Sequence, residues 1–266
     1  MNKITIVFLA VLGLTSCQKE IDIDLNSTNA QVVIEGEITD QNEPYTVKIT
    51  KTVNFTESNN YPAIKGANVT ISDNVGNSEK LIETSAGVYQ TSKLRGISGR
   101  IYTMTVSAEG KTYTAQSTMP ALVKLEDIRV VKSTFRPPTE KEDLYNVFPQ
   151  FTDPIATGNN YRFIQSTDKS GKDNTIIVAN DNVENGQPNS RPIFSRDFKI
   201  KVGDILTLEM RTIDRPTYNY LFTLVQIAGN GPGGGTTPSN PDSNIIGGAL
   251  GYFSAYTVQK KTIVVQ

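Results

Sequence analysis

Short segments that alternate apolar and polar residues constrain the fold of this chain more than any other feature. In Tyr45–Thr50 and Tyr102–Ser107 every second residue is apolar, which is typical of a β-strand with one face on a core. Turn residues, such as those of Ser85–Gly87 and Glu109–Gly110, separate these segments. Seven short strands between residues 31 and 120 predict an immunoglobulin-like β-sandwich. The other five are Val32–Ile38, Asn68–Ser72, Lys80–Thr84, Val88–Thr91 and Thr112–Thr118.

Residues 121–266 form a second predicted domain, which is β-rich and of sandwich or barrel type with one packed α-helix. Its clearest strand follows Gly203-Asp204, where Leu206, Leu208 and Met210 alternate with polar residues. The fold class is therefore mainly all-β, and the sequence leaves open whether the second domain is an open sandwich or a closed barrel. Further strands are predicted at Ile128–Lys132, Val147–Asp153, Tyr161–Thr167, Thr175–Ala179 and Thr262–Val265.

The one predicted helix spans residues 215–228. Asp214 is placed to cap it, and Pro216 falls in its first turn, where a missing N–H costs nothing. An apolar stripe at helical spacing predicts that this helix packs into a core rather than lining a ligand site. The stripe consists of Tyr218, Leu221, Phe222 and Val225.

The amino-acid inventory limits the chemistry that is available to the chain. There is no histidine and only one cysteine, which excludes Ser-His-Asp and Cys-His catalysis and histidine-ligated metal sites. A net charge of −1 without a basic face argues against nucleic-acid binding. Turns, caps and solvent faces explain the carboxylates that could serve a glycoside hydrolase, so we expect no catalytic residue, cofactor or metal. Those carboxylates are Asp153, Asp197, Asp204 and Glu209.

Three loop segments carry competing interpretations. Asp73–Gly76 could hold a metal, but the spacing of a hairpin turn explains it better. The glycines of Gly229–Pro241 follow a helix instead of opening one, so we interpret the segment as a flexible linker or binding loop and not as a phosphate loop. Asp181–Arg191 has a length that is uncommon in a loop without a binding role or disorder.

The N-terminus has the three parts of an export signal. Lys3 precedes an apolar segment, Ile4–Leu14, which rises only about 16 Å as a helix and is too short for a hydrocarbon core of about 30 Å. The following Leu14-Thr15-Ser16-Cys17 resembles the lipobox of bacterial lipoproteins. That resemblance implies cleavage between Ser16 and Cys17 and lipidation of Cys17. Residues 1–16 are then a signal peptide, and residues 17–30 a lipidated tether whose acyl chains hold the protein to a membrane.

The tether carries acidic residues, Glu20, Asp22 and Asp24, that alternate with apolar ones. They resemble the retention signals that send some lipoproteins to the cell surface. The same alternation also fits a half-buried strand, and a calcium site is a third interpretation.

The C-terminal block Ser243–Phe253 holds three glycines among apolar residues. We expect it to be a tightly packed bend in the core of the second domain rather than a ligand-facing turn. The block resembles the C-terminal signature of the domain-of-unknown-function 4249 family, apart from a longer Gly/Pro insertion before Asn244. Other pieces match that family in order along the chain: Val33–Gly36, Tyr45–Val47, Gly66–Ile71, Gly87–Tyr89, Asp153-Pro154, Tyr161–Phe163, Gly203-Asp204 and Tyr218-x-Tyr220.

Members of that family resemble outer-membrane lipoproteins and are often encoded beside TonB-dependent transporters, and the family supplies no catalytic residues to carry over. The resemblance implies a non-enzymatic binding or accessory protein, anchored in the outer membrane, that works with such a transporter in nutrient uptake. The alternatives are a structural or adhesive surface protein and a carboxylate-dependent glycoside hydrolase. The sequence leaves open the ligand, the transporter, the membrane leaflet and the oligomeric state.

Overall fold

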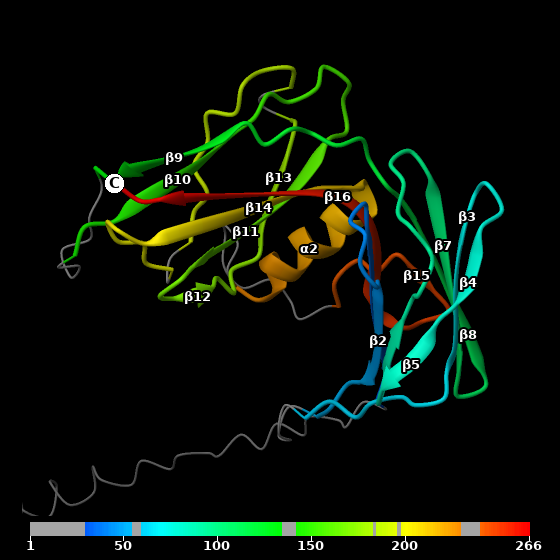
Figure 1. Cartoon of the computed structure of the whole chain (residues 1–266). Coiled ribbons are helices and arrows are strands. Elements are labelled where there is room, and N and C mark those ends of the chain that lie inside the picture. Colours follow the sequence, from blue (N-terminus) through cyan, green and yellow to red (C-terminus); the bar gives the residue numbers. More distant parts are fainter. Residues whose placement is uncertain (1–29, 55–59, 135–141, 183–184, 196–197, 230–239) are drawn as a thin grey trace, which may run out of the picture.

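A computed structural model describes residues 30–54, 60–134, 142–182, 185–195, 198–229 and 240–266. The fold is mostly β, with sheets packed in sandwich fashion and one α-helix among the described residues (Figure 1). The predicted fold class is confirmed. Cys17, Ser16 and the acidic tether lie outside the described residues, as does Asp197.

The strands form one long sheet and two smaller ones. The long sheet has the order β12-β11-β14-β16-β1-β2-β6-β5, and β13 pairs with β11 on the same side as β12. It contains β1 (Val32–Thr39), β2 (Thr46–Lys51), β5 (Ile82–Ser85), β6 (Val88–Gln90), β11 (Asn160–Thr167), β12 (Gly171–Lys172), β13 (Ile177–Asn180), β14 (Ile205–Ile213) and β16 (Leu250–Val264). A second sheet has the order β15-β8-β7-β3-β4, and β9 pairs with β10 on its own. These are β3 (Asn68–Asp73), β4 (Ser78–Lys80), β7 (Ile101–Ala108), β8 (Lys111–Thr118), β9 (Asp127–Lys132), β10 (Tyr145–Gln150) and β15 (Ile245–Ile246).

The first core lies between one end of the long sheet and the five-stranded sheet. Period-two alternation supplies its side chains, as predicted: Ile34 and Ile38 from β1 face Tyr102 and Met104 from β7, and all four are fully buried. The hairpin turn between β3 and β4 is also as predicted, because the Asp73 carboxylate accepts from the Asn77 backbone N–H at 2.8 Å and from its side chain at 2.7 Å.

Strand β16 joins the two halves of the molecule. Its first part, Leu250–Tyr256, pairs in parallel with β1, and its second part, Thr257–Val264, pairs antiparallel with β14 (Figure 1). Phe253 and Ala255 consequently belong to the first core, although they lie far along the chain in the predicted domain 121–266. The boundary at residue 120 stays a prediction. Only the end of β16 was predicted, because its first part is buried on both faces and does not alternate.

The glycine block before β16 is a tight bend, as predicted, but it packs on the first core and not on the second. A Cβ on Gly247 would lie 2.8 Å from the Thr112 carbonyl oxygen, and a Cβ on Gly251 would lie 2.0 Å from that of Ile34. Both glycines have positive φ angles, of 112° and 98°, and both therefore need glycine for conformation as well as for space.

The second core lies between the β9–β10 hairpin and the β11–β14 part of the long sheet. Leu206, Leu208 and Met210 point into it from β14, which confirms the predicted alternation. Helix α2 (Arg215–Ile227) begins where β14 ends. The Asp214 side chain caps it by accepting from Thr217 N at 3.1 Å, and its other carboxylate oxygen accepts from Ser117 Oγ at 2.7 Å. The cap thereby also ties the helix to β8.

In the part of the chain that the structure describes, no helix is both long enough and apolar enough to cross a membrane.

Candidate functional site

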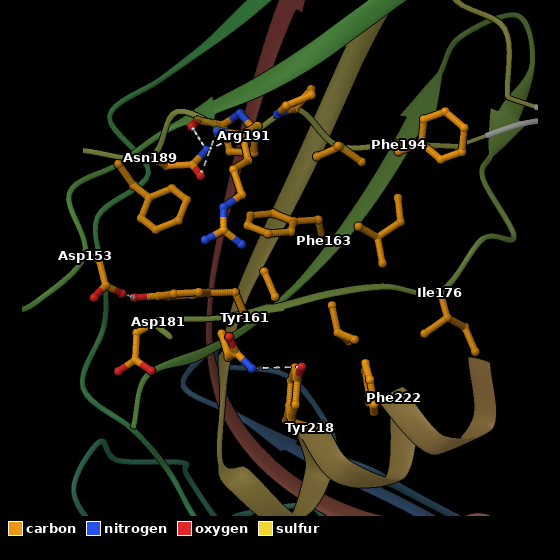
Figure 2. Close-up of a pocket in the computed structure, with 18 of the residues that line it drawn as sticks. Asp153, Tyr161, Phe163, Ile176, Asp181, Asn189, Arg191, Phe194, Tyr218 and Phe222 are labelled. Carbon is orange, nitrogen blue, oxygen red and sulfur yellow. Dashed lines mark hydrogen bonds between the residues drawn. The ribbon is translucent and has the colours of Figure 1, made fainter. Parts of the chain in front are cut away.

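A cavity of about 400 Å³ opens beside β11 and β13 (Figure 2). One wall is the face of these two strands, and a second wall is α2. The third comes from the segment after β10 and the described part of the loop that ends at Phe194. The cavity size falls within the ordinary range for small-molecule sites, which is about 300–1,000 Å³.

Three aromatic rings form the inner wall. Tyr161 and Phe163 are two apart on β11 and therefore share a face of the sheet, and Phe151 follows β10 directly. The centroid of the Phe151 ring lies 4.9 Å from that of Tyr161 and 6.1 Å from that of Phe163. All three side chains are buried, and this packing fixes the rings before any ligand arrives.

Helix α2 supplies a second pair of rings. Tyr218 and Phe222, one turn apart, stack with centroids 5.7 Å apart. The Tyr218 hydroxyl accepts from the side-chain amide of Asn180 at 3.0 Å, which ties the helix to the end of β13.

The apolar stripe on α2 is only partly core, which corrects the prediction. Tyr218 and Leu221 are buried, but Phe222 is 42% exposed and lines the cavity together with the half-buried Val225. The period of 3.6 residues identified the apolar side of the helix correctly. It could not show that the neighbouring strands leave a gap opposite one half of that side.

Two carboxylates lie at one end of the cavity, beside the hydroxyl tip of Tyr161 (Figure 2). Asp153 accepts a short hydrogen bond from the Tyr161 hydroxyl and a longer one, 3.3 Å, from the backbone N–H of Gly186. Asp181 accepts from the backbone N–H groups of Gly158 and Asn159 at 2.5 and 2.9 Å. Burial, then the hydrogen bond to Asp153 and the charges of Asp153 and Asp181, raise the pKa of Tyr161 far above its ordinary value, so this hydroxyl stays protonated.

The long loop predicted at Asp181–Arg191 forms a wall of the cavity. Its described part is tied to the end of β10 and to the residue that follows it, because Asn189 Nδ2 donates to Pro149 O at 2.8 Å and Asn189 N donates to Phe151 O at 2.8 Å. Gln187, Asn189 and Arg191 place polar groups on this wall, and Phe194 at its end is 73% exposed.

The structure separates the carboxylates that sequence grouped as hydrolase candidates. Asp153 lines the cavity, whereas Asp204 is held by Lys169 Nζ at 2.7 Å in the turn before β14. Glu209 pairs with Arg211 and Lys260, at 2.5 and 3.0 Å. The sequence missed Asp181 as a companion of Asp153, and the only local signal was its place at the start of an unusually long loop.

A second polar cluster lies around Glu37 of β1, on the face of the long sheet opposite to the first core. Both carboxylate oxygens of Glu37 accept from Arg211 at 3.1 Å, and they also accept from the hydroxyls of Tyr252 and Tyr256 at 2.7 and 3.1 Å. Arg162 lies 3.6 Å away. Burial raises the pKa of Glu37, but the charge of Arg211, the Tyr252 hydrogen bond and the charge of Arg162 lower it more, and the net shift is downward.

The Glu37 cluster is a structural network rather than a second binding site. A small hollow of about 320 Å³ adjoins it, but the Glu37 oxygens already accept four hydrogen bonds, from Arg211, Tyr252 and Tyr256. The Arg211 guanidinium also lies 4.3 Å from the centre of the Tyr256 ring. The cluster joins β1, β11, β14 and β16 across the long sheet.

Metal ligation has no candidate among the described ranges, in which no three Asp, Glu or Cys side chains come together. Asp73 is the residue that the sequence left open as a metal ligand. Its carboxylate instead accepts a hydrogen bond within the hairpin turn and forms an ion pair with Arg100 at 2.7 Å.

Comparison with known proteins gives a family without a described activity. No curated protein sequence matches the chain. The family described as a domain of unknown function (DUF4249) has a sequence model that matches residues 18–262, and the chain belongs to that family.

Proposed function

We propose that the protein is a non-enzymatic binding protein that takes a small ligand in the cavity between β11, β13 and α2. The cavity carries this proposal, because its size, its aromatic walls and its few polar groups are those of a ligand site. The exposed Phe194 and Phe222 at its edge support the proposal further, since a ligand would cover apolar surface that now faces water.

We propose further that Cys17 anchors the protein in the outer membrane by its lipid. In this arrangement the bound ligand is a nutrient that the protein passes to a TonB-dependent transporter. The lipobox-like sequence and the family's genetic neighbourhood support this part of the proposal. The cavity is compatible with it, because a tethered binding domain raises the local concentration of ligand near a transporter.

A glycoside hydrolase remains the second candidate, because two carboxylates, Asp153 and Asp181, line one cavity. The predominantly apolar lining favours binding over hydrolysis of a polar sugar. Hydrolysis of nitrophenyl glycosides by the wild-type protein, and its loss in Asp153→Asn, would establish the enzyme and reject the binding proposal.

Filling the cavity tests its role. Val225→Trp places a large ring in the cavity from the helix side, and we expect it to weaken binding of phenylbutanol, an uncharged ligand with an apolar ring and chain, at least tenfold by calorimetry. The matched control is Asn219→Trp on the exposed side of the same helix, which should leave the affinity unchanged. Absence of binding to the wild type, or equal affinities for wild type and Val225→Trp, would contradict a ligand site here.

The anchor and the partner are tested together by affinity purification from detergent-solubilised outer membrane. Wild type should fractionate with the membrane and recover a TonB-dependent transporter, whereas Cys17→Ala should lose membrane attachment, because it has no acyl chains. Mass spectrometry identifies the partner and, through it, the class of nutrient.

Two other results of this purification would change the proposal. Membrane attachment without a transporter would favour a free-standing binder or surface protein. Reduced cell adhesion on deletion of the protein, with nutrient uptake unchanged, would favour the adhesive function instead.

A further inference from the structure

Resting on the proposed binding function, we propose that the cavity takes an amphipathic cation: an apolar ring or chain that carries one ammonium group held at the Asp153–Asp181 end. The inference concerns the chemical class of the ligand and its orientation in the cavity. It depends on how the two carboxylates are buried and on what surrounds them.

Both carboxylates are more than nine-tenths buried, since Asp153 is 5% and Asp181 is 6% exposed. Their hydrogen-bond donors are neutral: a tyrosine hydroxyl for Asp153 and backbone N–H groups for both. Among the described residues neither carboxylate has an ion pair with Lys or Arg. Burying a charge without a partner of opposite sign is costly, so a cationic group at this end of the cavity would be stabilised.

Asp181 keeps acceptor capacity for that group. Both of its hydrogen bonds, from Gly158 N and Asn159 N, go to the same oxygen, Oδ2. An ionised carboxylate can accept about four hydrogen bonds, and within the described ranges nothing donates to Oδ1. An ammonium group with three donors matches this remaining capacity.

Arg191 is the cationic side chain among the described residues that line the cavity, and it does not cancel the acidic end. It is exposed, whereas both carboxylates are buried. The charge of an exposed guanidinium is screened by water and salt, while charges in the low-dielectric interior act at closer to full strength.

The cavity is polarised along its length. Figure 2 shows Asp153 and Asp181 together at one end and Phe194, Ile176 and Phe222 at the other. A ligand with its charge at one end and an apolar body can satisfy both ends at once. A metal ion would leave the aromatic end empty, and an anion would face two buried carboxylates.

The test compares three ligands of the same length and ring: phenylbutylamine, phenylbutanol and phenylbutyrate. Calorimetry on the full-length Cys17→Ala chain at pH 7 should give the amine at least a tenfold higher affinity than the alcohol, with the carboxylate weakest. Asp181→Asn should lower the affinity for the amine at least fivefold and leave that for the alcohol unchanged, because asparagine still accepts from Gly158 and Asn159.

The matched control is Asp173→Asn. Asp173 is a buried carboxylate as well, and it accepts from Gln165 Nε2 at 2.9 Å, but it does not line the cavity. This variant loses the same charge and should bind all three ligands like wild type. If Asp181→Asn does not fold, the order of the affinities of the three ligands for the wild-type protein tests the cationic-ligand proposal by itself.

The two proposals fail in different ways. If the alcohol binds as tightly as the amine, and Val225→Trp blocks binding of both, the proposal of a cationic ligand is overturned. The proposed binding function is then retained. The cationic ligand is also overturned if Asp173→Asn weakens the amine as much as Asp181→Asn does. Failure of all three ligands to bind would overturn both proposals.

Discussion

Replacing Gly251 by alanine is expected to destabilise the fold by more than about 3 kcal/mol. Gly251 pairs with Ile34 at the point where β16 meets β1, and a Cβ there would lie 2.0 Å from the Ile34 carbonyl oxygen. The obstacle is backbone, so it cannot rotate away, and the φ of 98° adds strain of about 1–3 kcal/mol for any other residue. Urea unfolding at pH 7 measures the loss.

Gly248→Ala is the matched control. Gly248 lies in the same bend and also has a positive φ, of 85°, but nothing lies within 4 Å of the position a Cβ would take. This variant should lose only about 1–2 kcal/mol, the cost of the backbone conformation itself. Equal losses for the two variants would show that contact with β1 does not set the requirement for glycine at residue 251.

Replacing Glu37 by glutamine is expected to cost about 2 kcal/mol at pH 7. The amide keeps the shape of the side chain but removes the charge that faces Arg211, whose side chain is only 13% exposed, and Arg162. Breaking a buried ion pair typically costs about 3–5 kcal/mol. The loss is smaller here because the Glu37 side chain is 31% exposed and Arg211 keeps Glu209 as a second partner.

The pH dependence gives the same prediction a second test. The folded-state pKa of Glu37 lies below its ordinary value of 4.5, so its contribution to stability is complete above that value and is lost as the pH falls through the lowered pKa. The difference in unfolding free energy between wild type and Glu37→Gln should therefore shrink on acidification below about pH 4.

Glu35→Gln is the control for this series. Glu35 lies two residues earlier on the same face of β1 and is exposed, so its replacement should change stability by no more than about 0.5 kcal/mol. A gap between wild type and Glu37→Gln that stays constant down to pH 3 would contradict the charged role of Glu37.

Local features were predicted well wherever the backbone itself produces a repeating pattern. The alternation in β14 and β7 showed which side chains are buried, because successive residues of a strand point to opposite faces. The start of α2 was equally clear, since Asp214 and Pro216 act within one turn. Membership of the family was also evident from the sequence, because its C-terminal block is distinctive.

The candidate site was predicted only in fragments. Asp153 was named among the carboxylates and the loop from Asp181 was judged unusual, but nothing in the sequence joined them to each other or to Phe222 of α2. These residues meet because β11 and β13 pair and the helix crosses beside them. Contacts between distant parts of a chain produce no repeating pattern in the sequence from which they could be predicted.

The sequence by itself determined that this chain is a mostly β protein of a particular family, with strands, turns and one helix near their observed places. Only the tertiary structure decided that β16 would join two halves through Gly251, that half of the helix stripe would line a cavity, and that two aspartates would share one end of it. The physical reason is the same in each case. Secondary structure follows from neighbours along the chain, whereas a cavity, a shared sheet and a buried charge are set by which surfaces pack together in space.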